Sequence, residues 1–218
     1  MPRIIDVLLS LLALLVLLPL FIPIVVILLL TGEHKVFYSQ TRVGYKNKDF
    51  KILKFATMLS NSANMGSGSL TLKNDPRVLP FGSFLRKTKI NELPQILNII
   101  IGDLSIVGPR PQMQVDFEKY SDTVQKNINN VRPGLTGIGS IIFRDEESLI
   151  TLAAENENPH DFYKRVIAPY KGEVEMWYQS HRSIYLDFQL IFMTAWAIIF
   201  PETRLYEKWF KDLPKRKF

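Results

Sequence analysis

Residues 4–30 read IIDVLLSLLALLVLLPLFIPIVVILLL, and this stretch decides the class of protein. Almost every side chain in it is apolar. As a straight helix it would be roughly 40 Å long, against roughly 30 Å of hydrocarbon in a bilayer. It is too long for the apolar core of a secretory signal, and no small-x-small cleavage site follows it. The sequence therefore predicts a membrane-associated protein.

Two topologies remain open for this segment. Pro19 and Pro23 each remove a backbone donor and bend a helix, and the carboxylate of Asp6 is expected to reach water or a headgroup. The segment is either a kinked transmembrane helix or a re-entrant helix-break-helix that returns to the same side. Positive residues crowd after it, which places the bulk of the chain in the cytoplasm: Lys35, Arg42, Lys46, Lys48, Lys51 and Lys54.

The rest of the chain has the composition of a globular domain. The 218 residues include no cysteine, which excludes disulfides, thiolate catalysis and cysteine metal sites. The three histidines show no metal-binding spacing. A formal charge of +6 suits contact with anionic lipid, phosphate or nucleic acid. We expect no nucleic-acid partner, because the basic residues cluster around Gly/Pro turns and form no recognition-helix pattern.

The local patterns predict mostly helices after one hairpin. Residues 35–59 alternate like short strands, with a turn at residues 44–48, and residues 60–76 form a polar loop. The expected helices are residues 81–87, residues 91–101 with Gly102 as the stop, residues 113–130 and most of the C-terminal third. A rigid turn is expected at residues 106–112 and a strand at residues 141–143. The apolar residues 184–200 are expected to lie on the membrane or against the first segment, and the basic, aromatic tail is typical of an interfacial anchor.

Residues 75–112 gather the groups that phosphate chemistry uses. Arg110 stands between Pro109 and Pro111, and a guanidinium with so little backbone freedom suits bidentate phosphate binding. A helix that starts near Asn91 would offer free N–H groups to an anion. Carboxylates next to these cations could hold Mg²⁺ on a diphosphate. On spacing alone, a set of surface ion pairs remains the alternative.

The segment DPRVLPFGSFLRKTKINELPQILNIIIGDLSIVGPRPQ at residues 75–112 resembles the signature of the bacterial sugar transferases, the monotopic polyprenol-phosphate phosphoglycosyl transferases. FKILKFATM at residues 50–58, VRPGLTG at residues 131–137 and LDFQLIFMTAW near the C-terminus add to the resemblance. It implies a re-entrant hairpin with both ends cytoplasmic. It also implies a UDP-sugar donor, undecaprenyl phosphate as acceptor, membrane lipid as a partner and Mg²⁺ as cofactor.

The resemblance also implies roles for single residues. In the family an Asp-Glu pair before the LPQ supplies a nucleophile and a partner carboxylate, and these positions are Asn91 and Glu92 here. Glu92 is also the expected metal ligand. The implied substrate-binding residues are Lys54, Arg86, Arg110, Arg132 and Glu175.

The chain departs from the family pattern at the nucleophile, because an amide cannot form the acyl phosphate. Three hypotheses follow: Glu92 replaces the missing aspartate, the transfer is direct, or the protein is an inactive relative. A further acidic pair at Asp145 and Glu146 could reach the site and compensate, or it could be a solvated acidic loop.

These observations together predict an α/β, mostly α, membrane-associated domain with amphipathic interfacial helices around a small catalytic core. Residues 1–33 would form the re-entrant hairpin, and residues 34–218 the transferase domain on the cytoplasmic face of the inner membrane. The expected function is transfer of a sugar 1-phosphate to undecaprenyl phosphate in glycoconjugate or exopolysaccharide assembly. The alternative is a catalytically silent scaffold or regulator of that pathway, and the interpretation also admits a homodimer.

Overall fold

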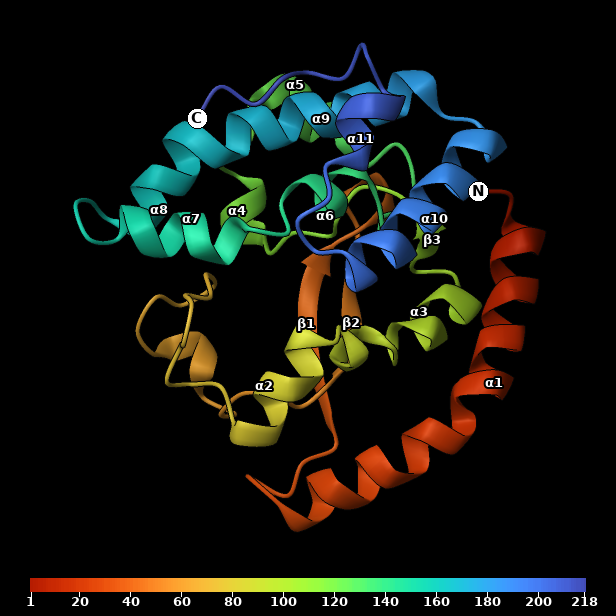
Figure 1. Ribbon diagram of the computed structural model, residues 1–218, viewed down its shortest axis with the longest axis vertical. Coiled ribbons are helices and arrows are strands. Elements are labelled where there is room, and N and C mark those ends of the chain that lie inside the picture. Colours follow the sequence, from red (N-terminus) through yellow and green to blue (C-terminus); the bar gives the residue numbers. More distant parts are fainter.

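The computed structural model describes residues 1–218 and is mostly helical, with two small sheets (Figure 1). The first half contains α1 Arg3–Leu30, β1 Phe37–Val43, η1 Tyr45–Asn47, β2 Asp49–Phe55, η2 Ser62–Asn64, α2 Pro80–Lys87, η3 Ile90–Glu92 and α3 Gln95–Ile101. The second half contains β3 Ser105–Val107, α4 Gln114–Phe117, α5 Asp122–Ile128, β4 Gly134–Thr136, α6 Ile138–Ile142, α7 Glu146–Ala153, α8 Pro159–Phe162, the π-helical turn η4 Tyr163–Ile167, α9 Ala168–His181, α10 Ile184–Ile199 and α11 Leu205–Trp209.

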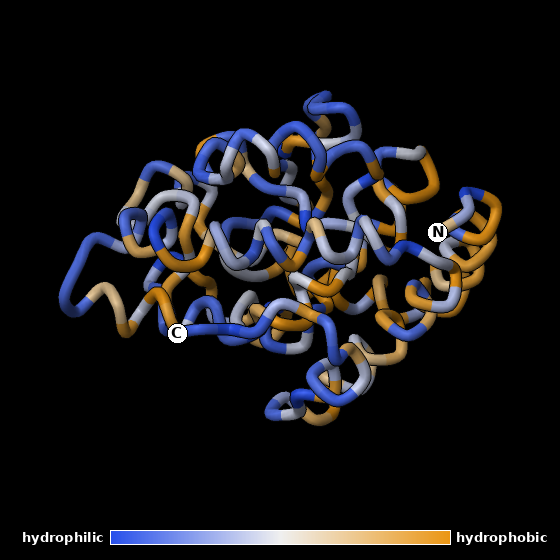
Figure 2. The backbone as a smooth tube through the Cα atoms, turned by 90° about the horizontal axis from the view of Figure 1, so that it is seen from above, coloured by the Kyte–Doolittle hydropathy of each residue, from blue (hydrophilic) through white to orange (hydrophobic).

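The apolar N-terminal segment is one bent helix, α1, that passes around one side of the molecule (Figure 1). Pro19 and Pro23 lie inside it, where each removes a backbone hydrogen bond. By length and composition, α1 is the one helix able to cross a membrane, with a mean hydropathy of 3.2 in its most apolar window. Figure 2 shows this apolar stretch as an orange band at the edge of the molecule that carries the N-terminus.

Asp6 corrects one expectation from the sequence, since its carboxylate reaches neither water nor a headgroup. It is 2% exposed. It accepts hydrogen bonds from Ser105 Oγ at 2.8 Å and from the backbone N–H of Ile106 at 2.9 Å. The carboxylate is satisfied by β3 because α1 lies along the edge of the globular part.

Both ends of α1 contact the same globular body. Near the first turn, the Arg3 guanidinium donates to the carbonyl of Ile100, at the end of α3, at 2.7 Å. Near the last turn, Ile24 and Leu28 pack with Phe55 of β2 and with α2 in a small apolar cluster. Most of the helix between these anchors presents exposed apolar side chains.

The predicted hairpin is confirmed. β1 and β2 pair antiparallel, with Tyr38 opposite Lys54 and Arg42 opposite Phe50, and the turn lies at residues 44–48. Because side chains alternate along a strand, Tyr38, Gln40 and Arg42 share one half-buried face of β1. The helix at residues 80–87 and the stop at Gly102, whose φ is +106°, also match the sequence prediction.

The two Gly/Pro turns meet in a second sheet that the sequence patterns did not predict. β3 and β4 pair in parallel, with Ser105 opposite Gly134. The backbones approach so closely that a Cβ at Gly134 would lie 2.1 Å from the Gly108 nitrogen. Only glycine fits there, which fixes the GPRP turn against the RPG turn.

Three further expectations need correction. Residues 141–143 form no strand, because Ile138, Ile141 and Ile142 bury one face of α6 against α9 and α10. The predicted helix at residues 113–130 is two helices, α4 and α5, separated at Ser121, whose side chain caps α5. Residues 106 and 107, expected at the start of a rigid turn, belong to strand β3.

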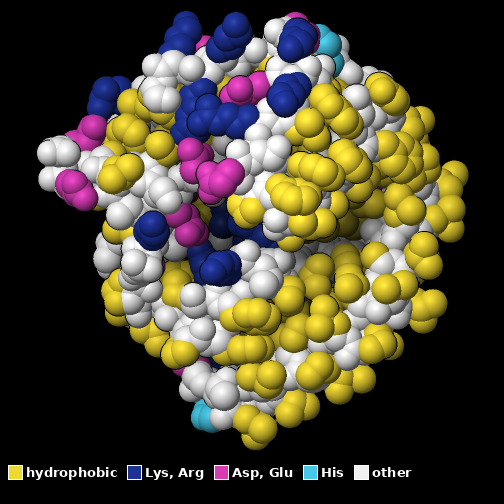
Figure 3. Space-filling model, viewed as in Figure 1, with side chains coloured by type: hydrophobic (Ala, Val, Ile, Leu, Met, Phe, Trp, Pro, Cys, Tyr) yellow, Lys and Arg dark blue, Asp and Glu magenta, His cyan; other side chains and the backbone are white.

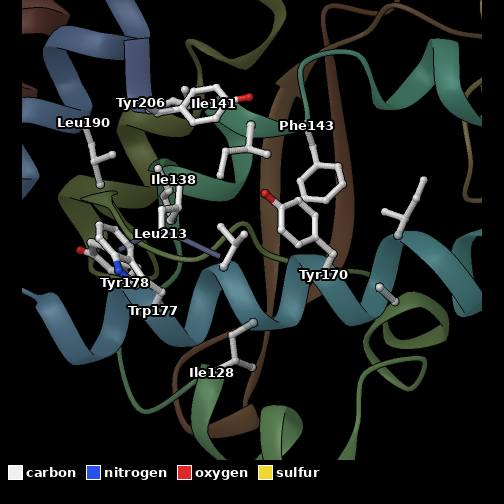
Figure 4. Close-up of a cluster of buried hydrophobic side chains, with 14 of the residues drawn as sticks. Ile128, Ile138, Ile141, Phe143, Tyr170, Trp177, Tyr178, Leu190, Tyr206 and Leu213 are labelled. Atoms are coloured by element: carbon white, nitrogen blue, oxygen red, sulfur yellow. The ribbon is translucent and has the colours of Figure 1, made fainter. Parts of the chain in front are cut away.

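The main core lies where α9 crosses α6 and α10 (Figure 4). Tyr170 of α9 lies against Phe143, and Trp177 and Tyr178 lie farther along α9, on the side of Ile138 and Leu190. The opposite face of α10 is apolar and exposed. Its exposed residues include Tyr185, Phe188, Phe192 and Trp196. Figure 3 shows broad apolar surface across the right and lower parts of that view.

Candidate active site

A basic cavity of about 810 Å³ lies between the β1–β2 hairpin, α2, α6 and α7. Figure 3 shows an opening near the centre of that face, with basic side chains inside and acidic ones along its rim. Nine lysine and arginine residues line the cavity, against five aspartate and glutamate residues. A drug-sized ligand fits a cavity of this volume, and the excess of cations favours an anion.

Glu92 is at the centre of the charged cluster. Its Oε1 accepts a hydrogen bond from Lys54 Nζ at 2.9 Å and from Arg110 Nη2 at 3.0 Å. These side chains come from β2, from η3 and from the turn after β3. The carboxylate side chain is 13% exposed and that of Lys54 is 17% exposed, so both groups are largely desolvated yet face the cavity.

Burial and charge compete in setting the pKa values of this cluster. Burial alone would raise the pKa of Glu92, but attraction by Lys54, Arg110 and Lys89 outweighs it and holds that pKa well below its usual range. Burial lowers the pKa of Lys54 to about 8, and Glu92 limits the fall. Glu92 also raises the pKa of Arg110. Near neutral pH the cluster therefore carries two cations and one carboxylate.

Asn91 lies next to this cluster, where the family pattern has a nucleophile. The residue is 5% exposed, its side chain lines the cavity, and its Oδ1 has no hydrogen-bond partner. The helix expected to start here begins later, because residues 90–92 form a 3-10 turn and α3 starts at Gln95. The helix N-terminus that the sequence predicted at Asn91 is therefore not there.

The acidic residues at the start of α7 lie partly in the cavity and partly outside it. Asp145 pairs with Arg216 of the C-terminal tail at 2.8 Å, and it does not line the cavity. Glu146 does line it and pairs with Lys171 at 2.7 Å. Glu147 pairs across the cavity with Arg86 of α2 at 2.7 Å. Of the predicted pair, only Glu146 is placed to contact a ligand in this cavity.

Arg132 and Glu175 lie outside the cavity lining. Arg132 donates to the carbonyl of Gly102 at 3.0 Å and stacks over the Tyr45 ring, so its position gives no support to a nucleotide contact. Glu175 is 1% exposed behind the cavity wall, where its Oε1 lies 3.4 Å from the backbone nitrogen of Arg110. Burial raises the pKa of Glu175 to about 7.

Several polar atoms in the cavity have no partner within the protein. They are Asn91 Oδ1, Arg42 Nε, Ser140 Oγ and Tyr163 Oη, all buried and all belonging to residues that line the cavity. Buried polar groups are nearly always hydrogen-bonded, so a cluster of unpaired ones marks a site for a polar ligand. Sequence reasoning missed Arg42, Ser140 and Tyr163. The alternation of Tyr38, Gln40 and Arg42 along β1 was the available signal for Arg42.

The residues present fit a magnesium ion that takes most of its ligands from a diphosphate. No three aspartate, glutamate or histidine residues gather into a site of their own. Asn91 Oδ1 is unpaired, and both contacts to Glu92 are to Oε1, so a neighbouring amide oxygen and carboxylate oxygen remain. Mg²⁺ is commonly held by one or two such protein oxygens together with substrate phosphates.

Proteins of similar sequence support the same kind of chemistry as the geometry of the cavity. A family model described as bacterial sugar transferase matches residues 1–201. The chain is 39% identical over 163 residues to the exopolysaccharide production protein ExoY of Sinorhizobium fredii, covering 68% of this chain and 72% of the relative. It is 31% identical over 198 residues to the exopolysaccharide production protein PSS of Rhizobium leguminosarum bv. phaseoli, covering 88% and 92%. It is also 31% identical over 176 residues to the undecaprenyl-phosphate galactose phosphotransferase of Salmonella typhimurium, covering 74% of this chain and 33% of that protein.

Proposed function

The chain belongs to the bacterial sugar transferase family, and on that premise we propose that it moves a sugar 1-phosphate from a UDP-sugar onto undecaprenyl phosphate. It is a phosphoglycosyl transferase of glycan assembly, and its relatives are named as exopolysaccharide production proteins and an undecaprenyl-phosphate galactose phosphotransferase. The observation that carries the proposal is the Lys54–Glu92–Arg110 cluster inside a basic cavity large enough for a nucleoside diphosphate sugar.

The transfer proceeds directly, without a covalent intermediate on the protein. An oxygen of the acceptor phosphate attacks the sugar-bearing phosphorus of the donor, the bond from that phosphorus to the bridging oxygen breaks, and UMP leaves. The acceptor phosphate is already anionic near neutral pH, so no proton has to be removed. The amide of Asn91, which cannot act as a nucleophile, is compatible with this single step.

The protein contributes charge and position to this step. Two anions must approach each other, and the cations of the cavity reduce their repulsion. Arg110, fixed between two prolines and paired with Glu92, presents a guanidinium with little freedom to move. Lys54 adds a partly desolvated ammonium, which interacts more strongly with a phosphate than one in bulk water.

Asn91 and Glu92 would hold a magnesium ion on the diphosphate. The ion would neutralise charge on the leaving phosphate. Glu92 would then bind the ion through one oxygen while Lys54 and Arg110 keep the other in place. The same residues position the donor whether or not the ion is required for turnover.

The membrane segment is proposed to be re-entrant, with both ends on the cytoplasmic face of the inner membrane. The support is that Arg3 and Asp6 near one end, and Leu28 at the other, contact the same globular body. A helix that crossed the bilayer would separate these contacts. Residues 1–33 then form the membrane hairpin and residues 34–218 the cytoplasmic domain, with the apolar face of α10 at the lipid surface. A homodimer remains a prediction from the sequence.

The experiment is UMP release by the detergent-purified chain with undecaprenyl phosphate, Mg²⁺ and a panel of UDP-sugars. Glu92→Gln should lower the rate by roughly two orders of magnitude, because it removes the charge that holds Lys54 and Arg110. Asp145→Asn is the matched control and should leave the rate unchanged, since Asp145 faces Arg216 outside the cavity. If no donor yields UMP although UDP binds, the silent scaffold replaces the enzyme as the function.

A further inference from the structure

Arg42 is a half-buried cation that forms no salt bridge, although the charges of Asp116 and Glu92 attract it. Its Nη2 donates to Gln40 Oε1 at 2.5 Å and its Nη1 to the carbonyl of Pro111 at 3.3 Å. Its Nε is buried without a partner, although the side chain lines the cavity. The nearby carboxylate of Asp116 is already paired with Lys119 at 2.8 Å.

This arrangement is costly to the folded protein. Burial lowers the pKa of Arg42 to about 10 and repulsion from Arg110 adds to the effect, while attraction by Asp116 and Glu92 opposes it. A charge partly removed from water without a salt bridge destabilises a fold, so a structural role would be better served by a neutral side chain of similar shape. The unpaired Nε belongs to a side chain that lines a cavity rich in cations, where an anionic ligand would offer it a partner.

Tyr163 completes the surroundings of this cation. Its hydroxyl is buried, lines the same cavity and has no hydrogen-bond partner. Arg42 and Arg110 line this cavity as well, and their charges oppose the effect of burial on the pKa of the phenol. Burial holds the pKa of Tyr163 well above its usual range, so the hydroxyl keeps its proton and can donate.

We propose that Arg42 and Tyr163 form a second anion subsite, which binds a phosphate of the nucleotide donor. The inference rests on the proposed function and deepens it, because a direct transfer must hold a donor diphosphate and an acceptor phosphate at the same time. The Lys54–Glu92–Arg110 cluster alone offers one such place. Arg42 supplies the other with its free Nε–H, and the Tyr163 hydroxyl donates beside it.

The positions of Lys54 and Arg42 along the β1–β2 hairpin indicate which subsite binds the acceptor phosphate and which binds the donor phosphate. Lys54 lies opposite Tyr38, four residues from Arg42 along β1, which is roughly 13 Å of strand. Phe55, next to Lys54, packs against the last turns of α1, so the Lys54 end is the one near the membrane helix. An acceptor phosphate on a lipid arrives at that end. The Arg42 end is therefore left for the donor phosphate that departs with UMP, while the sugar-bearing phosphate of the donor meets the acceptor beside Glu92.

The test is binding, measured by titration calorimetry with the full chain in detergent, so that it does not depend on turnover. Arg42→Gln should weaken UDP binding at least about tenfold, because it removes a charge-assisted contact. It should leave the melting temperature of the unliganded chain unchanged or raise it, since an unneutralised cation is lost. Arg165→Gln, an exposed arginine outside the cavity, is the matched control and should change neither quantity.

Two further binding measurements test whether this subsite binds the donor. Tyr163→Phe removes one hydroxyl without disturbing the packing and should weaken UDP binding several-fold. Undecaprenyl phosphate binding should survive in Arg42→Gln and fall in Lys54→Gln. UDP affinity within twofold of wild type in both Arg42→Gln and Tyr163→Phe would overturn the subsite. Loss of undecaprenyl phosphate binding with intact UDP binding in Arg42→Gln would overturn its assignment to the donor. A wild-type chain that binds UDP through Arg42 but forms no UMP would refute the transfer and leave the subsite standing.

Discussion

At the scale of the residue, Lys54 should set the alkaline limit of activity. Its pKa is about 8 because it is largely buried, and it is useful to an anionic ligand only while protonated. The value of kcat/KM should therefore fall above about pH 8, since this quantity reports groups of the free enzyme. Lys54→Arg, whose guanidinium stays protonated, should move the fall to higher pH. A fall that stays near pH 8 in that variant would assign it to another group.

Glu175 should make the stability of the fold depend on pH. Burial raises its pKa to about 7, so in the folded chain the carboxyl stays protonated up to that pH, whereas in the unfolded chain it ionises near its usual value. The free energy of unfolding is therefore highest at low pH. It falls by on the order of 3 kcal/mol as the pH rises from the usual carboxyl range to about 7.

Replacing this carboxyl by an amide should remove the loss. Glu175→Gln should melt at nearly the wild-type temperature at pH 5 and several degrees higher at pH 8, measured by thermal denaturation in detergent. Glu173→Gln, on the exposed side of the same helix, should match wild type at both values. An equal effect of Glu175→Gln on the melting temperature at both pH values would mean that burial does not raise the pKa of this carboxyl.

At the scale of the element, α1 should have both ends on one side of the membrane. The chain contains no cysteine, so single cysteines can be placed without background. In intact spheroplasts a membrane-impermeant maleimide should label neither Pro2→Cys nor Lys35→Cys, both at exposed positions flanking α1, and it should label both after lysis. Labelling of Pro2→Cys alone in intact spheroplasts would show that α1 spans the bilayer.

The elements that the sequence predicted are those with a local pattern. The β1–β2 hairpin alternates within itself, and α3 ends at a glycine in the left-handed region. β3 and β4 are only three residues each and pair with partners 29 positions away, so no local period reveals them. The apolar residues 141–143 suggested a strand, but the burial of Ile138, Ile141 and Ile142 against α9 and α10 selects a helix.

The residues of the candidate site divide in the same way. Some are indicated by the neighbouring sequence, and others come from segments far along the chain. Lys54, Glu92 and Arg110 followed from the resemblance to a family, and the fold brings them together. Tyr163 and Lys171 enter the cavity from helices far along the chain, where nothing in the neighbouring sequence distinguishes them. Asp145 lies outside the cavity and Glu146 lines it, because adjacent residues at a helix start point in different directions.

At the scale of the whole molecule, a basic cavity lies beside an apolar surface. α1 and the exposed face of α10 present large apolar side chains, while the cavity carries the excess of positive charge (Figure 3). An acceptor with an apolar tail and a phosphate head needs both surfaces close together. A soluble nucleotide sugar needs only the cavity, which agrees with separate places for the two substrates.

The most direct test follows the transferred phosphate. A UDP-sugar labelled at its sugar-bearing phosphorus is incubated with the chain, with and without undecaprenyl phosphate, and the lipid and the precipitated protein are counted separately. The account predicts label in the lipid only when acceptor is present, and none in the protein at any time. Asn91→Asp is the positive control, because a carboxylate at that position restores the family's nucleophile and should trap label in the protein without acceptor. Label in the wild-type protein, or none in the lipid with any donor, would contradict direct transfer.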